Sequence, residues 1–265
     1  MSSDVALAAR LATAAGELVL RIRRDADLGR LSPEPGAPER AARRQLRDLA
    51  DRAAHDFLLA ALTDERPSDA VLSEEGVDDS ARLTADRLWI IDPVDGTWEF
   101  GQGRDDFAVH VALWERASQQ LIAGALALPA TGITYDSDNP VAVAGGLPTE
   151  RSIRLVVSRS RPPQQLERLV VGLADLLPGQ SVEVYSVGSA GAKTAEVIAG
   201  RADAYIHDAG LSEWDVAAPA AVAVAAGLHV SHLDGSAIRY NQPAPLVGDL
   251  LVATPALAAM VLALL

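Results

Sequence analysis

Length, composition and charge exclude several classes of protein before any motif is considered. The chain has 265 residues, of which 49% are hydrophobic, so it can bury a substantial core as one large unit or as two closely packed halves. A formal net charge of -13 argues against binding to nucleic acid polymers or anionic membranes, and the absence of cysteine excludes disulfides, thiolate metal sites and cysteine nucleophiles.

The N-terminal segment predicts a helix and no signal peptide. Residues 1–4 carry no basic region followed by an apolar core, so we expect a cytoplasmic protein. Apolar side chains then recur at helical spacing over residues 4–24. Residues 25–38 contain three prolines and two glycines among mixed charges, which predicts a loop.

A second helix is predicted over residues 40–62. Asp51 lies in its first half among arginines, and an acid in that setting usually belongs to a solvated helix face. The side chains expected to point inward are Leu49, Ala53, Phe57, Leu58 and Leu62.

Two short apolar strands each end in acids. Glu74 and Glu75 follow residues 70–73, and Asp92 and Asp95 follow residues 89–91. The linker between them is long enough to bring the second strand back beside the first, which would place four carboxylates on one rim of a sheet. Unpaired charge at the edge of a core is costly, so this rim suggests a bound cation.

The chain then reads as a helix start followed by an antiparallel meander. Gly96 and Thr97 resemble the first turn of a helix, whose free N–H groups and positive dipole end suit a phosphate. Strand-like runs separated by short turns follow at residues 107–114, 121–128, 132–135 and 141–144.

Strands and helices alternate in the second half, which predicts a mixed sheet flanked by helices. The apolar run at residues 250–265 is shorter than the roughly 20 residues of a membrane span and fits a strand and a terminal helix better. The expected strands are 153–157, 182–185, 204–207, 229–231 and 250–253. One helix is expected to end near residue 177, and two more are expected at residues 190–199 and 214–226.

Asp215 has two interpretations. It stands at the start of the helix at 214–226, where a carboxylate commonly caps the first turn. Together with Glu74, Asp92 and Asp95, however, it completes a set of carboxylates beside the Val94 carbonyl, with no histidine or cysteine. Such hard oxygen ligands suit Mg²⁺ or Mn²⁺, and several acids sharing more than one ion suit phosphoryl transfer.

These motifs resemble those of the inositol monophosphatase superfamily, whose members are Mg²⁺-dependent, lithium-sensitive phosphatases. The residues that carry the resemblance, which covers nearly the whole chain, are 73–75, 89–97, 188–191 and 214–218. The chain is most similar to the CysQ branch, the 3'(2'),5'-bisphosphate nucleotidases that hydrolyse 3'-phosphoadenosine 5'-phosphate (PAP). Residues pointing to this branch are Glu99-Phe100, 158–160, 233–236 and 240–241.

The resemblance implies an α/β (α+β) fold, the layered αβαβα sandwich of the inositol monophosphatase and fructose-1,6-bisphosphatase type. Residues 1–150 would form an N-terminal half with most metal ligands, and residues 151–265 a C-terminal half with Asp215 and substrate-binding residues, together one compact catalytic unit. It also implies two or three Mg²⁺ ions, with Mn²⁺ as a substitute and Li⁺ as an inhibitor. The loop at 25–38 lacks the lysine and threonine pattern of relatives, and this departure argues against a third metal position and against closure of the loop.

Roles transfer from the family to matching positions. Asp51, Glu74 and Thr97 would position the attacking water, which gives Asp51 a function beyond a solvated face. Glu75 is either a partner of the metal ligands or a solvated turn acid. The metal ligands would be Glu74, Asp92, Asp95, Asp215 and the carbonyl of Val94.

Substrate contacts are expected on both sides of the metal site. Gly96 and Thr97 would hold a phosphate oxygen, and a second phosphate needs cationic or backbone donors. Lys193 is the only lysine in the chain and stands where relatives place one near that phosphate, with a solvated helix lysine as the less favoured alternative. Arg159 and Arg161 could also be ordinary loop arginines. The candidates for the second phosphate are Ser158, Arg159, Arg161, Gly188, Ala190 and Lys193.

The resemblance therefore predicts a Mg²⁺-dependent phosphatase that removes the 3'-phosphate of PAP, and also acts on its sulfated relative PAPS, in sulfur metabolism. The binding partner would be a small phosphate ester, and we expect no binding to nucleic acid polymers or membranes. The protein would be a monomer or a homodimer. One alternative is a phosphatase for inositol or another sugar monophosphate. Another is an inactive regulatory protein that binds metal and phosphate.

Overall fold

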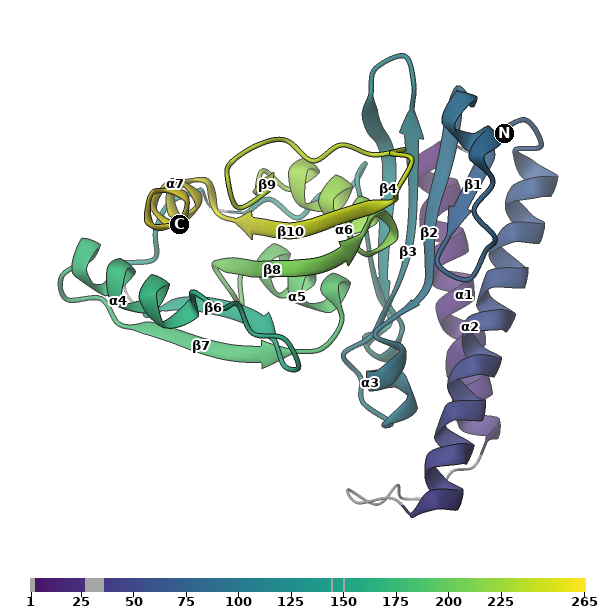
Figure 1. Ribbon diagram of the computed structural model, residues 1–265, viewed down its shortest axis with the longest axis horizontal. Coiled ribbons are helices and arrows are strands. Elements are labelled where there is room, and N and C mark those ends of the chain that lie inside the picture. Colours follow the sequence, from purple (N-terminus) through teal and green to yellow (C-terminus); the bar gives the residue numbers. More distant parts are fainter. Residues whose placement is uncertain (1–2, 27–35, 144, 150) are drawn as a thin grey trace.

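Helices and sheets alternate in layers in the computed structural model, which describes residues 3–26, 36–143, 145–149 and 151–265 (Figure 1). Helices α1 (Asp4–Asp25) and α2 (Ala37–Glu65) cover one face of the first sheet. Helices α5 (Ala190–Ile198) and α6 (Glu213–Ala225) lie between the two sheets, and α4 (Leu166–Leu176) and α7 (Pro255–Leu264) cover the outer face of the second. The predicted αβαβα order is confirmed.

The first sheet follows chain order, β1-β2-β3-β4-β5. Only β1 and β2 run parallel, and the remaining pairs are antiparallel, as the meander predicted. The strands are β1 (Ala70–Ser73), β2 (Arg87–Asp95), β3 (Ala108–Glu115), β4 (Gln120–Leu128) and β5 (Ile133–Asp136). A 3-10 helix (Ser80–Thr84) connects β1 to β2, and the short helix α3 (Thr97–Gly101) follows β2.

The second sheet has the order β7-β6-β8-β10-β9 and mixes parallel with antiparallel pairs, as expected. Strand β6 lies parallel to both β7 and β8, whereas β10 runs antiparallel to β8 and β9. The strands are β6 (Ile153–Ser158), β7 (Val182–Val187), β8 (Ala204–Ser212), β9 (His229–Ser231) and β10 (Leu246–Ala253).

Three buried clusters correspond to the spaces between the layers. One lies between α1, α2 and the first sheet and includes Trp89 and Leu58, and a second fills the space between the sheets around α5 and α6 and includes Tyr205. The third lies between the second sheet and α4 and α7, and includes Leu169. The acidic end of β2 lies beside the start of α5, because Asp95 accepts hydrogen bonds from the N–H groups of Ala190 and Gly191.

Helix α1 is capped by Ser3, whose hydroxyl accepts a hydrogen bond from the Ala6 N–H at 3.1 Å. In α2 the prediction that Leu49 points inward is wrong, because its side chain is 56% exposed. Leu46 and Ala50, three residues before and one residue after Leu49, are buried instead and define the inner face.

Residues 141–143 do not form the strand predicted at 141–144. Only Val143 of these residues packs against the central cluster, and its N–H donates to the Ala226 carbonyl at 3.2 Å rather than to β5. Val141 and Ala142 are exposed. Ala144, and residues 27–35 of the loop predicted at 25–38, lie outside the described residues.

Candidate metal centre

The acids at the ends of β1 and β2 lie side by side because these two strands are parallel. Ser73 pairs with Ile91, and the Glu74 N–H donates to the Ile91 carbonyl at 3.4 Å. The chain therefore leaves both strands at the same edge, as the sequence predicted. Oxygen atoms of Asp92, Asp95 and Asp215 all lie within 4.8 Å of one another.

Asp92 is buried with one oxygen unused. Its side chain is 1% exposed, and its Oδ1 accepts a hydrogen bond from the Val94 N–H at 3.0 Å. Its Oδ2 has no hydrogen-bond partner among the described residues. Burial, followed by the negative charge of Glu74, raises the pKa of Asp92 well above its usual range. A carboxylate in this position needs a proton or a cation.

Asp95 is held by the second half of the chain. Its two oxygens accept hydrogen bonds from the N–H groups of Ala190 at 3.1 Å and Gly191 at 2.6 Å, which begin α5. His110 Nε2 lies 3.2 Å from Asp95 Oδ2. Burial opposes ionisation of Asp95, but the charge and proximity of His110 outweigh it, and the net pKa is lowered. The positive charge of His110 and the N–H donors of α5 thus favour the ionised form of Asp95, whereas Asp92 lacks such partners among the described residues.

Asp215 caps its helix and also lies in the cluster of acids. Its Oδ2 accepts a hydrogen bond from the Ser212 N–H at 2.6 Å as part of a capping box at the start of α6. The same carboxylate belongs to the cluster with Asp92 and Asp95. Burial and the charge of Asp95 raise the pKa of Asp215 to about 6. Capping fixes the carboxylate in place beside the other two acids.

Glu74 and Glu75 lie at the exposed edge of the cluster. Desolvation by the surrounding groups, and then the charge of Asp215, raise the pKa of Glu74 to about 7. Part of the Glu74 side chain still reaches solvent, so it would be the most accessible of the four predicted carboxylate ligands. Glu75 is exposed as well, and its charge acts on Asp51 and Glu74.

Asp51 and Thr97 meet at the same edge. The Thr97 hydroxyl donates to the Val94 carbonyl at 2.9 Å, and the Asp51 carboxyl lies 3.5 Å from that hydroxyl. Asp51 is 9% exposed, so the solvated-face interpretation is wrong. Burial, and then the charges of Glu75 and Glu74, raise the pKa of Asp51 to about 8. The Asp51 carboxyl can therefore hold or release a proton near neutral pH.

The donor set fits Mg²⁺ or Mn²⁺. Its candidate ligands are carboxylates and the Val94 carbonyl, all hard oxygen donors. Asp92 Oδ2 has no partner among the described residues, and burial together with the charges of neighbouring acids raises the pKa of both Asp92 and Asp215, so a bound cation would stabilise their ionised forms. The roles of the individual ligands stay a prediction.

The turn before α5 packs tightly against the first half of the chain. Gly96 has a φ of +88°, and a Cβ at this position would lie 2.8 Å from Ser189. A Cβ on Gly188 would lie 2.4 Å from Glu99. Its N–H donates to Asp106 Oδ2 at 2.8 Å. Only glycine allows the two segments to approach this closely.

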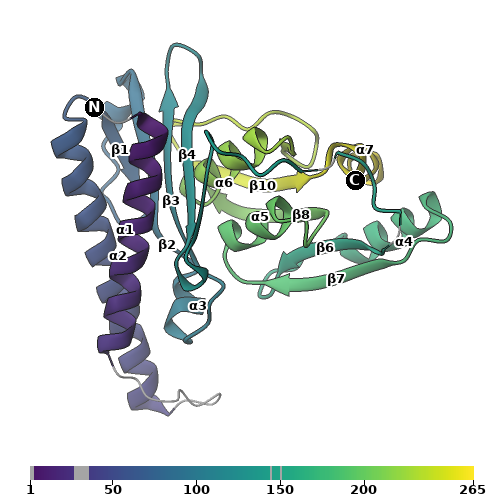
Figure 2. The same cartoon turned by 180° about the vertical axis from the view of Figure 1, so that it is seen from behind.

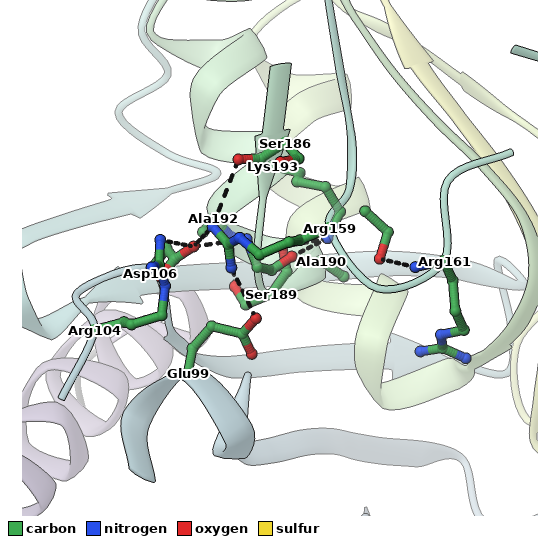
Figure 3. A network of polar contacts seen from close by, with 12 residues as sticks. Glu99, Arg104, Asp106, Arg159, Arg161, Ser186, Ser189, Ala190, Ala192 and Lys193 are labelled. Carbon is green, nitrogen blue, oxygen red and sulfur yellow. Dashed lines mark hydrogen bonds and ion pairs between the residues drawn. The ribbon is translucent and has the colours of Figure 1, made fainter. Parts of the chain in front are cut away.

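The two candidate arginines differ in availability (Figure 3). Arg159 pairs with Glu99 at 3.1 Å and with Asp106 at 2.6 Å, so its guanidinium is already neutralised. The backbone N–H of Arg161 donates to the buried Ser158 hydroxyl at 3.2 Å, while its guanidinium has no ion pair among the described residues. The charge of Arg161 acts on Asp215, which places it within electrostatic reach of the metal centre.

Lys193 is buried at 3% exposure, so it is not a solvated helix lysine. Its ammonium group donates to the carbonyls of Gly188 and Ser189 and lies 5.0 Å from the centre of the Tyr205 ring. Burial lowers its pKa to about 8. In this arrangement Lys193 supports the turn that positions the N–H of Ala190, and whether it also reaches a substrate phosphate stays a prediction.

Three buried polar residues near the acids escaped the sequence analysis. Burial favours the neutral form of His110, but the charge of Asp95 outweighs it and raises the pKa of His110. The Tyr205 hydroxyl and His207 Nδ1 have no partner among the described residues, and both residues lie on β8 next to Lys193. The available signal was a polar or aromatic residue within an apolar strand, which needs a partner once buried.

Comparison with known proteins decides the family. The model of the inositol monophosphatase family matches residues 1–265. The chain belongs to the inositol monophosphatase family. It is 48% identical over 258 residues to the 3'-phosphoadenosine 5'-phosphate phosphatase of Mycobacterium leprae, covering 93% of this chain and 88% of that protein.

Other family members support the same branch. The 3'(2'),5'-bisphosphate nucleotidase CysQ of Salmonella typhimurium is 31% identical over 201 residues, covering 72% of this chain and 78% of that protein. The crystal structure of CysQ from Bacteroides thetaiotaomicron superposes with a TM-score of 0.72 at 30% identity, covering 96% and 97% of the two chains. Within the described residues, no helix combines the length and apolar character needed to cross a membrane.

Proposed function

We propose that the protein is a Mg²⁺-dependent phosphatase that hydrolyses the 3'-phosphate of PAP to give AMP and inorganic phosphate. The observation that carries this proposal is the cluster of buried Asp92 and Asp95 with partly buried Asp215, in which one Asp92 oxygen has no hydrogen-bond partner among the residues that the structure describes. The nucleotide substrate rests on the similarity to relatives named for PAP and for bisphosphate nucleotides.

The residues that would hold the metal come from both halves of the chain. Glu74, Asp92, Asp95 and the Val94 carbonyl lie at the ends of β1 and β2, and Asp215 begins α6. Bound Mg²⁺ supplies positive charge that lowers the pKa of water and neutralises the leaving oxygen. We expect Mn²⁺ to substitute and Li⁺ to inhibit.

The chain's own groups would orient the attacking water. The Thr97 hydroxyl lies 2.9 Å from the Val94 carbonyl, to which it donates, and 3.5 Å from the Asp51 carboxyl, so both side chains would lie beside the attacking water. In its ionised form the Asp51 carboxylate, which lies 3.5 Å from the Thr97 hydroxyl, would accept the proton that the water loses as its oxygen bonds to phosphorus and the bond between phosphorus and O3' breaks. The reaction then forms no covalent bond between enzyme and phosphate.

Arg161 is our candidate for the second phosphate of the substrate. Arg159 is neutralised by two acids, whereas the Arg161 guanidinium is exposed and unpaired within the described part of the chain. An arginine of this kind can bind a phosphate through two parallel hydrogen bonds. Ser158, Gly188, Ala190 and Lys193 would shape the surrounding backbone rather than carry the charge.

The test compares substrates at one Mg²⁺ concentration. We expect kcat/KM for PAP to exceed that for inositol 1-phosphate and for fructose 1,6-bisphosphate by at least a hundredfold. Higher activity on either sugar phosphate would overturn the nucleotide assignment, and Mg²⁺ binding without hydrolysis of any ester would indicate a regulatory protein. PAPS, assayed in parallel, tests the predicted activity on the sulfated nucleotide.

Arg161→Ala tests the second-phosphate site. Loss of a charge-assisted hydrogen bond costs about 1.5–3 kcal/mol, so KM for PAP should rise about 10- to 100-fold. KM for 3'-AMP, which lacks the 5'-phosphate, should change far less. Arg168→Ala, an exposed arginine on α4, is the matched control. An equal effect of Arg161→Ala on both substrates would refute the assignment.

A further inference from the structure

His110 is a buried histidine in the middle of β3 with no role in the reaction described above. Its side chain is 0% exposed, and the other residues of the strand are apolar apart from Glu115 at its end. In the sheet it pairs with Asp92 of β2 on one side and with Leu126 of β4 on the other. It therefore lies directly beside one of the three clustered acids.

Both ring nitrogens of His110 face oxygen atoms that belong to the metal centre or adjoin it. Nδ1 makes a hydrogen-bond contact of 3.0 Å with the Trp214 carbonyl. Nε2 lies 3.2 Å from Asp95 Oδ2, within ion-pair distance, but has no hydrogen-bond partner of good geometry among the described residues. Trp214 immediately precedes Asp215. One imidazole thus contacts the Asp95 carboxylate and the backbone that carries Asp215, while its own strand pairs with Asp92.

The ring also supports the start of α5. A Cβ on Gly191 would lie 2.2 Å from His110 Nε2, so the backbone of Gly191 rests directly on the imidazole. The N–H of this same glycine donates to Asp95 at 2.6 Å. His110 and the start of α5 therefore hold the Asp95 carboxylate from two directions.

The first turn of α6 lacks one of its backbone hydrogen bonds. Pro219 lies inside this helix and has no N–H to donate to the carbonyl of Asp215, four residues earlier. The turn that carries Asp215 consequently has one intrahelical hydrogen bond fewer than usual. The contact between His110 and Trp214 anchors this turn to the first sheet.

We propose that His110 is a positioning residue that holds Asp95 and Asp215, which come from different halves of the chain, at the spacing that a divalent cation requires. It touches neither the substrate nor the reacting atoms. The inference rests on the proposed function only in assigning these acids to the metal. Without the histidine, the same acids remain but their spacing is no longer fixed by a shared contact.

Three variants separate the two contacts. His110→Leu removes both, His110→Asn keeps a donor near Nδ1 and so the contact with Trp214, and His110→Gln keeps a donor near Nε2 and so the contact with Asp95. Mg²⁺ affinity of the full chain is measured by titration calorimetry and repeated with Mn²⁺ by electron spin resonance. We expect the leucine variant to bind at least tenfold more weakly than the wild type, and the asparagine and glutamine variants each to recover part of the loss.

Val111→Ala is the matched control, because Val111 is the next residue of β3 and its side chain is fully buried in the cluster between the first sheet and α1 and α2. It should lower the melting temperature without weakening Mg²⁺ binding. Wild-type affinity in His110→Leu, or no recovery in the asparagine and glutamine variants, would overturn the proposal. If all three His110 variants unfold while Val111→Ala folds, His110 is a purely structural residue and the proposal is equally rejected.

Hydrolysis of PAP by the wild type is measured separately, so that the proposed substrate and the proposed positioning role of His110 can each be refuted without the other. A wild type that hydrolyses no nucleotide but shows the expected order of Mg²⁺ affinities overturns the substrate alone. A wild type that hydrolyses PAP while His110→Leu binds Mg²⁺ normally overturns the positioning role alone.

Discussion

Asp92→Asn should make the metal-free protein more stable while abolishing its activity. Oxygens of Asp92 lie within 4.8 Å of oxygens of Asp95 and Asp215. Two unit charges at that distance repel by about 3.5 kcal/mol at an effective dielectric constant near 20. The asparagine amide keeps the acceptor for the Val94 N–H and places an NH₂ group where the unpartnered oxygen now lies.

The expected gain is smaller than the full repulsion, because the raised pKa of Asp92 means that a bound proton already relieves part of it in the metal-free protein. A remaining gain of about 1–2 kcal/mol would raise the melting temperature in EDTA by about 2–8 °C. Mg²⁺ at a hundredfold excess over its Kd should stabilise the wild type by about 2.7 kcal/mol and leave the variant unchanged.

The assay combines thermal melts, with and without Mg²⁺, and turnover of PAP. Turnover should fall at least about a thousandfold, which corresponds to about 4 kcal/mol of transition-state stabilisation. Asp86→Asn, whose side chain is 95% exposed, is the control and should change neither quantity. A variant that melts below the wild type in EDTA refutes the electrostatic argument, and one that still responds to Mg²⁺ refutes the assignment of Asp92 as a ligand.

The remaining predictions concern the residues around this acid. Asp95→Asn should abolish turnover and also destabilise the fold by about 2–4 kcal/mol in urea, since Gly191 loses a charged acceptor; a variant of normal stability would contradict this. In EDTA the free energy of unfolding should fall as the pH rises from 5 to 8, by about 1.4 kcal/mol per pH unit for each proton involved. The sign follows because Asp51, with its pKa raised to about 8, keeps a proton that the unfolded chain has already lost, and a free energy that rises over this range would contradict it. Gly188→Ala should cost about 1–3 kcal/mol in urea unfolding because its methyl group would lie 2.4 Å from Glu99, and unchanged stability would show that the turn can relax.

The acidic edge of the first sheet was predictable because its signals are local. Apolar runs that stop abruptly at Glu74 and Asp92 indicate where strands end, and parallel strands end at the same edge. The alternation of elements likewise predicted the second sheet. The prediction for Leu49 was wrong because adjacent residues of a helix point in directions that differ by about a quarter turn or more. A broad apolar pattern therefore does not show which residues lie at the borders of the buried face.

The connections across the layers could not be read from the chain. His110 and the Trp214 carbonyl are separated by 104 positions, and the partner of Asp95 at the start of α5 is similarly distant. Periodicity locates a buried face but does not identify which polar group of another layer meets it. The sequence also could not show that Lys193 turns into the protein rather than toward solvent.

The exposed Arg161 and Trp98 stand apart from the buried acids, and this separation has an evolutionary consequence. Trp98 is 52% exposed, and Arg161 lies on the loop after β6 with its guanidinium unpaired within the described residues. Within the described part of the chain, neither side chain hydrogen-bonds to the carboxylate cluster, whereas Asp95 and Asp215 accept hydrogen bonds from backbone amides on α5 and before α6. If these exposed side chains contact the substrate, as we propose for Arg161, mutations there would alter which phosphate ester is accepted while leaving the acidic cluster unchanged, so related enzymes could diverge in substrate without rebuilding their chemistry.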